Sequence, residues 1–192
     1  MNTRDKLVTE AARLLDAGGE AAVTLRAVGH AAGVSHNAPY RHFKDRSALL
    51  AAIAERDFGM LSARFEQERT GSGTPIERLK RALGAFIQYG RDYPDRYRLL
   101  FSDPAIGAAE GSLEAAALGS FSAFAALVEE CQSAGALPPR PTLALAGLLY
   151  ATTHGLIDLA AGGRIREQKG LAGPEQGVAL LLSLLEMGRI ED

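Results

Sequence analysis

The sequence has no tryptophan and a single cysteine, and aromatic residues make up only 6% of its 192 residues. The lone cysteine, Cys131, cannot form an intramolecular disulfide, so a reducing compartment is the simplest expectation. The first residues are amphipathic and charged throughout, without the apolar run of a signal peptide. No later stretch of ~20 residues is free of charges and of proline or glycine clusters. We therefore expect a cytoplasmic protein that does not span a membrane.

The chain also lacks the short motifs that accompany common catalytic chemistry. It contains no glycine-rich phosphate loop, nucleophile elbow, Cys-x-x-Cys, His-x-x-x-His or Glu-x-x-His pattern. His154 and Asp158 together would supply at most two metal ligands. We expect no metal, no cofactor and no enzymatic activity. An enzyme is the main alternative from another class, and a helical ligand-binding or adaptor protein without DNA binding is a second.

The two ends of the chain differ in charge, although the whole chain has a formal net charge of -2. Residues 1–50 contain seven Lys or Arg against five Asp or Glu, together with His30, His36 and His42. The remaining residues contain fourteen Lys or Arg against eighteen Asp or Glu. This asymmetry has the sign expected of a DNA-binding end joined to an acidic body.

Apolar residues recur at three- and four-residue spacing along the chain, and no segment shows sustained strand-like alternation. The pattern therefore predicts an all-α fold. Turn-forming sequences, such as the tract at 70–75, separate the expected helices. Beyond the amino-terminal segment we expect helices over residues 47–67, 76–91, 94–101, 112–135, 142–161 and 174–189.

The first 50 residues are expected to form three short helices around one core. The glycine pair at 18–19 should close a first helix, and Thr24 stands where the N-cap of a second helix belongs. Gly33 permits a sharp reversal, after which Ser35 caps a third helix with Pro39 in its first turn. The expected inward-facing residues are Leu7, Ala11, Leu14, Leu15, Leu25, Val28, Ala32, Val34, Tyr40 and Phe43.

Two stretches of this segment carry a family resemblance: T-L-R-x-V-x-x-x-A-G-V-S at 24–35 and P-Y-R-H-F-K-D-R-x-A-L-L at 39–50. They resemble the DNA-binding domain of the tetracycline-repressor (TetR) family of bacterial transcriptional regulators. The resemblance implies an amino-terminal helix-turn-helix domain at 1–50 and a ligand-binding and dimerisation domain at 51–192, with about nine helices in all. It also implies a repressor that a small, hydrophobic effector releases from a double-stranded DNA operator.

The resemblance implies that residues 35–43 form the recognition helix in the major groove. The residues expected on the phosphate backbone are Thr24, Tyr40, and Lys44 or Arg46, and Ser35 can either cap the helix or donate to a phosphate oxygen. The exposed start of a recognition helix reaches base edges, and the expected base readers are His36, Asn37 and Arg41. The alternative is structural: Tyr40 and Phe43 would be core residues, and Arg41, Lys44 and Arg46 a solvated face. The coincidence of cap, turn, aromatic spacing and basic residues in one window favours DNA binding.

The carboxyl-terminal helices at 142–161 and 174–189 are apolar around much of their circumference. A single short recognition helix reads few base pairs, so operator binding needs two copies. We expect these two helices to form the interface of a homodimer, and the alternative is that one monomer buries them.

The segment YATTHG at 150–155 resembles the carboxyl-terminal domain of a TetR subgroup named for a Trp-His-Gly signature. Tyr150 stands in place of the tryptophan, so only His154 and Gly155 match. Tyr150, His154 and Asp158 share one helical face, either as a polar strip of a ligand pocket or as a His154–Asp158 hydrogen bond inside the bundle. A small-molecule pocket would have mainly apolar walls. Its candidate residues are Phe86, Tyr89, Phe101, Phe121, Phe124, Tyr150 and His154.

Overall fold

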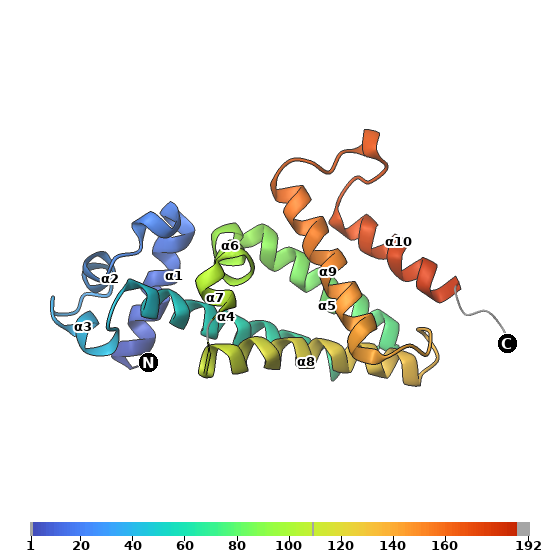
Figure 1. Cartoon of the computed structure of the whole chain (residues 1–192), viewed down its shortest axis with the longest axis horizontal. Helices are drawn as coiled ribbons and strands as arrows, with labels where there is room; N and C mark the ends of the chain where they lie inside the picture. The colour runs from blue at the N-terminus through green and yellow to red at the C-terminus, as the bar shows by residue number, and fades with distance from the viewer. Residues whose placement is uncertain (1, 109, 188–192) are drawn as a thin grey trace. The chain divides into compact units, whose positions relative to one another are not determined.

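The computed structural model describes residues 2–108 and 110–187, and all regular structure within these ranges is helical (Figure 1). The all-α prediction is confirmed. The described chain forms two compact units, residues 2–60 with 93–118 and residues 61–92 with 119–187. The first unit therefore contains residues 2–50 of the expected amino-terminal domain, together with residues 51–60 and 93–118.

The first unit is built from α1 (Thr3–Ala22), α2 (Leu25–Ala31), α3 (Ala38–His42), the first part of α4 (Arg46–Arg69), α6 (Pro94–Ser102), α7 (Pro104–Gly107) and the start of α8 (Ser112–Ser133). The second unit is built from the rest of α4 and α8, α5 (Pro75–Asp92), α9 (Thr142–Ala161), the 3₁₀ turn η1 (Glu167–Lys169) and α10 (Pro174–Met187). The expected spans agree with these bounds within a few residues. Residues 188 and 189 of the last expected helix lie outside the described residues.

Helix α7 is not among the expected helices, because a short sequence with proline and glycine is typical of a turn. It forms because the Asp103 carboxylate accepts a hydrogen bond from the Ala105 N–H at 2.8 Å, while Pro104 occupies the first turn. Both features favour a helix start. One turn of helix therefore stands where the sequence predicts a break.

Helix α1 is interrupted where the glycine pair predicts its end. Gly18 and Gly19 have non-helical backbones, with φ of -151° and 65°, and helical structure resumes as far as Ala22. The predicted position of the break is right, but the helix does not end there. The Thr24 prediction is confirmed: its Oγ1 accepts a hydrogen bond from the Ala27 N–H at 3.1 Å and caps α2.

A charge network with buried members Arg96 and Asp57 joins three helices of the first unit. Arg96 of α6 donates to both carboxylate oxygens of Asp16 in α1, at 2.8 and 2.5 Å, and to Asp57 of α4 at 3.5 Å. Asp57 is fully buried and also accepts from Arg56 at 2.9 Å. The Arg96 guanidinium lies 4.0 Å from the centre of the Tyr93 ring. One side chain thus holds α1, α4 and α6 together.

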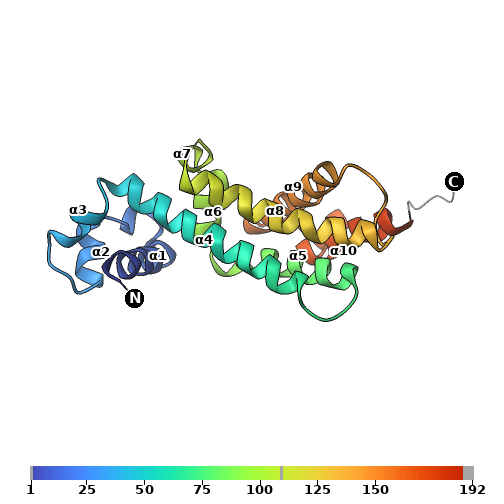
Figure 2. The same ribbon diagram turned by 90° about the horizontal axis from the view of Figure 1, so that it is seen from below.

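In the second unit, α9 and α10 lie side by side (Figure 2). Gly177 of α10 permits their close approach, since a Cβ atom there would lie 2.8 Å from both terminal methyl carbons of Leu156 in α9. Helix α5 packs its apolar stripe against both helices. Aromatic residues from α4, α5, α8 and α9 fill the space between these helices.

Two helices, α8 and α9, are long and apolar enough to cross a membrane by length and composition alone. Mostly buried core helices of water-soluble proteins pass the same test. Only 39% and 33% of their apolar windows are buried in one chain, so each leaves apolar surface open. The expectation of no membrane span stays a prediction, and the open surface needs another explanation.

The Arg96 network generates a stability prediction. Replacing Arg96 with Met leaves the buried Asp57 carboxylate with one cation fewer, and breaking a buried ion pair typically costs about 3–5 kcal/mol. We expect Arg96→Met to lower the free energy of unfolding by about 3 kcal/mol in denaturant titrations. The matched control is Arg98→Met, whose side chain is exposed and pairs with Asp95, and it should change stability by less than about 1 kcal/mol. Equal effects of the two substitutions would contradict the proposed importance of the network.

Candidate nucleic-acid interface

Helices α2 and α3 pack through a glycine and a proline. A Cβ atom on Gly29 of α2 would lie 2.8 Å from the Cγ atom of Pro39 in α3, a distance that real Cβ contacts essentially never show. Between the helices Gly33 turns the chain with a φ of 60°, a left-handed conformation that favours glycine. A Cβ atom on Gly33 would meet nothing within 4 Å, so this glycine serves the turn and not the packing.

Helix α3 starts later than predicted. It runs from Ala38 to His42, with Asn37 at the N-cap position and no side-chain cap. Ser35 does not cap it; the Ser35 carbonyl accepts a hydrogen bond from the Ala38 N–H at 2.9 Å, which makes residues 35–38 a turn. Pro39 lies in the first turn of the helix, as predicted. The correction moves His36 and Asn37 from the helix into the turn that precedes it.

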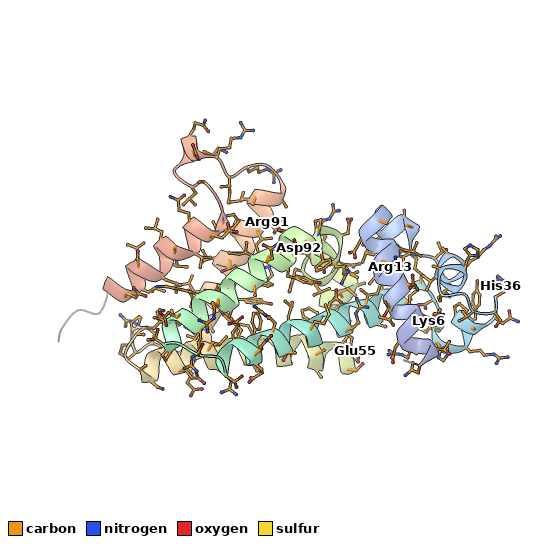
Figure 3. The ribbon with its side chains drawn as sticks, turned by 180° about the vertical axis from the view of Figure 1, so that it is seen from behind. Lys6, Arg13, His36, Glu55, Arg91 and Asp92 are labelled. Atoms are coloured by element: carbon orange, nitrogen blue, oxygen red, sulfur yellow. The ribbon has the colours of Figure 1, made fainter. Side chains whose placement is uncertain are left out.

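The exposed side of this region carries most of the predicted DNA contacts. The exposed members of that set are Thr24, Ser35, His36, Asn37, Tyr40, Arg41 and Lys44. Figure 3 shows His36 projecting outward from the turn before α3. Tyr40 is 52% exposed and its ring lies 5.8 Å from the His36 ring, so the expectation that it faces the core is wrong. Phe43, in contrast, is buried as expected.

Arg46 differs from the other predicted phosphate contacts, because its donors are engaged within the first unit. Its Nε donates to the Val23 carbonyl at 2.8 Å, and its Nη2 donates to the Glu20 carbonyl at 2.5 Å. The Glu20 carboxylate lies 3.2 Å from the same Nη2 atom. Arg46 therefore ties the start of α4 to the end of α1. A phosphate contact by Arg46 stays a prediction, and the structure adds a positioning role.

Two residues that shape this interface, Asp45 and Gly29, were not predicted. Asp45 accepts a hydrogen bond from the Ala48 N–H at 2.8 Å and caps α4, and the capping rule could have found it. Gly29 was not singled out, although a glycine inside a short helix signals a close backbone approach. Both act by positioning α3 and the residues that follow it.

The exposed polar and cationic side chains of α3 and its flanking residues are chemically suited to binding nucleic acid. Among the described residues, neither Arg41 nor Lys44 forms a salt bridge, whereas Arg4 and Arg13 pair with Glu55 and Glu10. Unpaired cations attract phosphate, and exposed amide, hydroxyl and imidazole groups match the donors and acceptors of base edges. No group of three potential metal ligands occurs among the described residues.

Most of the predicted pocket residues meet in the second unit. The rings of Phe86 and Tyr150 stack at 5.1 Å, and His154 meets them edge-on at 4.9 and 4.5 Å. Phe121 and Phe124 each lie 5.6 Å from Tyr150. These five residues are called the aromatic cluster below.

The other two predicted pocket residues are Tyr89 and Phe101. Tyr89 is buried on α5. Phe101 lies in the first unit, where its ring is 5.6 Å from Phe58 and 5.0 Å from Tyr97.

Burial sets the protonation of the polar groups in this unit. It lowers the pKa of His154 to about 4 and raises that of Tyr150 above its ordinary value, because a charge would lose its hydration there. Both side chains are therefore uncharged at neutral pH. Asp158, the alternative partner of His154, is exposed. Burial also raises the pKa of Cys131 to about 11, which keeps the thiol protonated and poorly reactive.

The two close-packed short helices, with an exposed polar face on the second, define a helix-turn-helix DNA-binding protein. Comparison with known families agrees with this class. Residues 7–53 match the family described as "Bacterial regulatory proteins, tetR family", and residues 79–184 match "Tetracyclin repressor-like, C-terminal domain". The chain belongs to the TetR family of bacterial regulatory proteins. Neither description names the Trp-His-Gly signature, and assignment to that subgroup is not confirmed.

Individual relatives agree with the family and the fold. The chain is 30% identical over 102 residues to the uncharacterized HTH-type transcriptional regulator YerO of Bacillus subtilis (strain 168), a match that covers 52% of this chain and 35% of YerO. It superposes on a protein of unknown function from Rhodococcus sp. RHA1 with a TM-score of 0.82 and 28% identity, over 98% and 95% of the two chains.

A more distant structural relative is SmeT, the repressor of the Stenotrophomonas maltophilia multidrug efflux pump SmeDEF. Its TM-score is 0.65 at 23% identity, over 100% of this chain and 92% of SmeT. This likeness shows the fold alone. TetR-family regulators are not typically enzymes, and the comparisons lend the enzyme alternative no support.

The contact between α2 and α3 generates a first prediction. Gly29→Ala places a methyl group against the Pro39 ring, and overpacking typically costs about 1–3 kcal/mol. We expect lower stability and weaker DNA binding, measured by thermal unfolding and fluorescence anisotropy. The control is Gly59→Ala in α4, where a Cβ atom meets nothing within 4 Å, and it should stabilise the protein by about 0.5–1 kcal/mol. Gly29→Ala with wild-type stability and affinity would contradict the role of this contact.

The His154 environment generates a second prediction, on pH. Below pH 6.5 the unfolded imidazole takes up a proton, whereas the folded one does so only near pH 4. The free energy of unfolding should therefore fall between pH 6.5 and 4, by up to about 1.4 kcal/mol per pH unit, and show no His154 contribution above that range. Subtracting the stability curve of His154→Phe from that of the wild type isolates the effect. A flat difference across this interval would show that the partly buried His154 imidazole is not held uncharged.

Proposed function

We propose that the protein is a homodimeric repressor that binds an operator through the exposed face of α3 and leaves it when a small, hydrophobic effector binds. The observation that carries this proposal is the set of exposed polar and cationic residues at 35–44, on a helix whose buried side is held by Gly29 and Phe43. A face that is polar outward and firmly packed inward suits a recognition element.

The residues of this face divide by position and chemistry. His36, Asn37 and Arg41 are the proposed base readers. His36 and Asn37 lie just before α3, at the end of a recognition helix that enters the major groove, and Arg41 lies within the short helix itself. The proposed phosphate contacts come from residues with hydroxyl or cationic groups, namely Thr24, Ser35, Tyr40, Lys44 and Arg46. The Thr24 hydroxyl accepts from Ala27 and still has its own proton to donate to an oxygen atom.

Exposed leucines support dimerisation through α9 and α10. Leu148 and Leu159 of α9 are exposed and lie about three turns apart on one face. Leu180 and Leu184 of α10 are each 53% exposed and one turn apart. Adjacent helices with exposed apolar faces form a surface that a second copy can cover, as a four-helix interface. The same interface accounts for the open apolar surface of α9.

The proposed effector site is the aromatic cluster. Its ring faces provide apolar surface, and the uncharged His154 and Tyr150 provide a few hydrogen-bonding groups. Burying a charge in such surroundings is costly, so we propose an uncharged, apolar effector. The effector releases DNA by binding more tightly to a conformation that cannot hold the operator. We expect the protein to act in the cytoplasm, where its operator lies.

Operator binding is tested by selecting bound sequences from a random DNA pool. Asn37→Ala should change the recovered site, since it removes a base reader. Lys44→Gln should recover the wild-type site, with weaker binding and a salt slope smaller by about 0.9 per subunit. Arg13→Gln, which removes a paired cation elsewhere in the unit, is the control and should keep the wild-type slope. No enriched site for the wild type would contradict operator binding.

Dimerisation is tested by introducing charge into the exposed apolar faces. Leu148→Glu and Leu184→Glu should each convert the dimer to a monomer at micromolar concentration in light scattering, because burying an unpaired carboxylate is unfavourable. Leu118→Glu is the matched control, since Leu118 is similarly exposed on α8. A monomeric wild-type protein, or variants that remain dimeric, would contradict an interface formed by α9 and α10.

A further inference from the structure

Two buried hydroxyl groups of the second unit differ in their hydrogen bonding. Thr153 of α9 is buried, and its Oγ1 donates to the Leu149 carbonyl one turn earlier at 2.7 Å. Ser120 of α8 is fully buried, and its Oγ has no hydrogen-bond partner within the described residues. A helical serine can also donate to the carbonyl four residues before it. The Ser120 hydroxyl therefore leaves unused the acceptor that its own helix provides.

A buried hydroxyl without a partner destabilises a protein, because it loses its hydrogen bonds to water on folding and gains none in return. Two other buried polar atoms of the described residues also lack hydrogen bonds. These are Nε of Arg78 and Oε2 of Glu130, whose side chains form an ion pair at 3.1 Å. Ser120 is the uncharged member of this set, and no ion pair explains its burial.

Ser120 stands on the same face of α8 as a ring of the aromatic cluster. Phe124 follows it by four residues, which corresponds to about 40° around the helix and about 6 Å along it. Both residues are fully buried. The Phe124 ring lies 5.6 Å from Tyr150 of α9 and 5.6 Å from Phe65 of α4. The hydroxyl is thus on the core side of α8, one turn from the proposed effector site.

We propose that Ser120 is a specificity-determining residue of the effector site, which donates a hydrogen bond to an oxygen atom of the effector. This inference rests on the proposed effector site at the aromatic cluster and narrows the ligand that it takes. Aromatic rings accept apolar surface, and a single buried hydroxyl suits one uncharged acceptor, such as a ketone, ester or ether oxygen. A carboxylate fits less well, because burying its charge among rings is costly.

The unpaired state of the hydroxyl is what gives it selectivity. An effector with an acceptor oxygen satisfies a donor that the free protein leaves without a partner, whereas a hydrocarbon of the same shape leaves it unpaired. Thr153 offers no such gain, because its hydroxyl already donates to the backbone. Ser120 therefore favours ligands with an acceptor over purely apolar ones.

The first test uses the full-length protein without a ligand. Ser120→Ala removes the unpaired hydroxyl and should raise the unfolding temperature by about 2–4 °C in thermal denaturation. Ser122→Ala changes an exposed serine of the same helix, so it measures the gain in helix propensity alone and should raise it by about 1 °C. Thr153→Val removes a bonded hydroxyl and should not raise it. A rise in Ser120→Ala no larger than that in Ser122→Ala would overturn the proposal.

The second test compares two uncharged probes of similar shape, acetophenone and ethylbenzene, which differ in the ketone oxygen. Their dissociation constants are measured by calorimetric titration of the full-length protein. Ser120→Ala should weaken acetophenone binding about 3- to 10-fold, the value of one hydrogen bond, and should not weaken ethylbenzene binding. Thr153→Val should keep the wild-type ratio of the two affinities. The carbonyl stretching frequency of bound acetophenone should be higher in Ser120→Ala, because the carbonyl has lost its donor.

Each outcome of the second test bears on the proposal. Equal changes in the affinity for both probes would show that Ser120 only shapes the packing, and would overturn it. An unchanged affinity for acetophenone in a folded Ser120→Ala protein would overturn it as well. Failure of the wild type to bind either probe would contradict the effector site at the aromatic cluster, and the Ser120 contact with it. The Ser120 contact alone fails when the wild type binds both probes and Ser120→Ala keeps their affinity ratio.

Discussion

The attachment of Arg96 to Asp16 and Asp57 is the interaction on which the first unit depends. A fully buried carboxylate such as Asp57 is tolerated only where cations and hydrogen bonds replace its lost hydration. Its partners come from α4 and α6, while Asp16 brings α1 to the same guanidinium. Apolar packing tolerates small slides between helices, but paired charges at hydrogen-bond distance do not. The helix that leads into the helix-turn-helix is therefore held at a defined position against α4 and α6.

Local features of the sequence predicted local features of the structure. The N-cap at Thr24, the break at 18–19 and the reversal at Gly33 were all predicted, because each depends on residues close in the chain. The prediction errors arise where a side chain contacts residues that are distant in the sequence. Arg46 looked like a free cation because its acceptors, Val23 and Glu20, lie more than twenty residues earlier.

The candidate site was predictable in composition but not in orientation. The sequence identified the polar set at 35–44, yet placed Tyr40 against the core, where only Phe43 is buried. Three-residue spacing puts two side chains on one side of a long helix, but α3 has only five residues and Phe43 already lies beyond its end. Ser35 was assigned as a cap because its residue type favours that role, while the backbone there forms a turn instead. The pocket prediction grouped Phe101 with residues of another unit because aromatic content carries no information about partners.

The contact of Gly29 with Pro39 has a consequence for how such proteins diverge. It involves a backbone and a proline ring, so the outward side chains of α3 take no part in this contact. Substitutions at Asn37 or Arg41 would change an exposed surface, where the effect on stability is usually within about 0.5 kcal/mol. After gene duplication, a copy of this protein could therefore acquire a new operator by point mutations while its fold stays intact. The exposed residues of α3 can change because the residues that pack this helix, Gly29 and Pro39, are different ones.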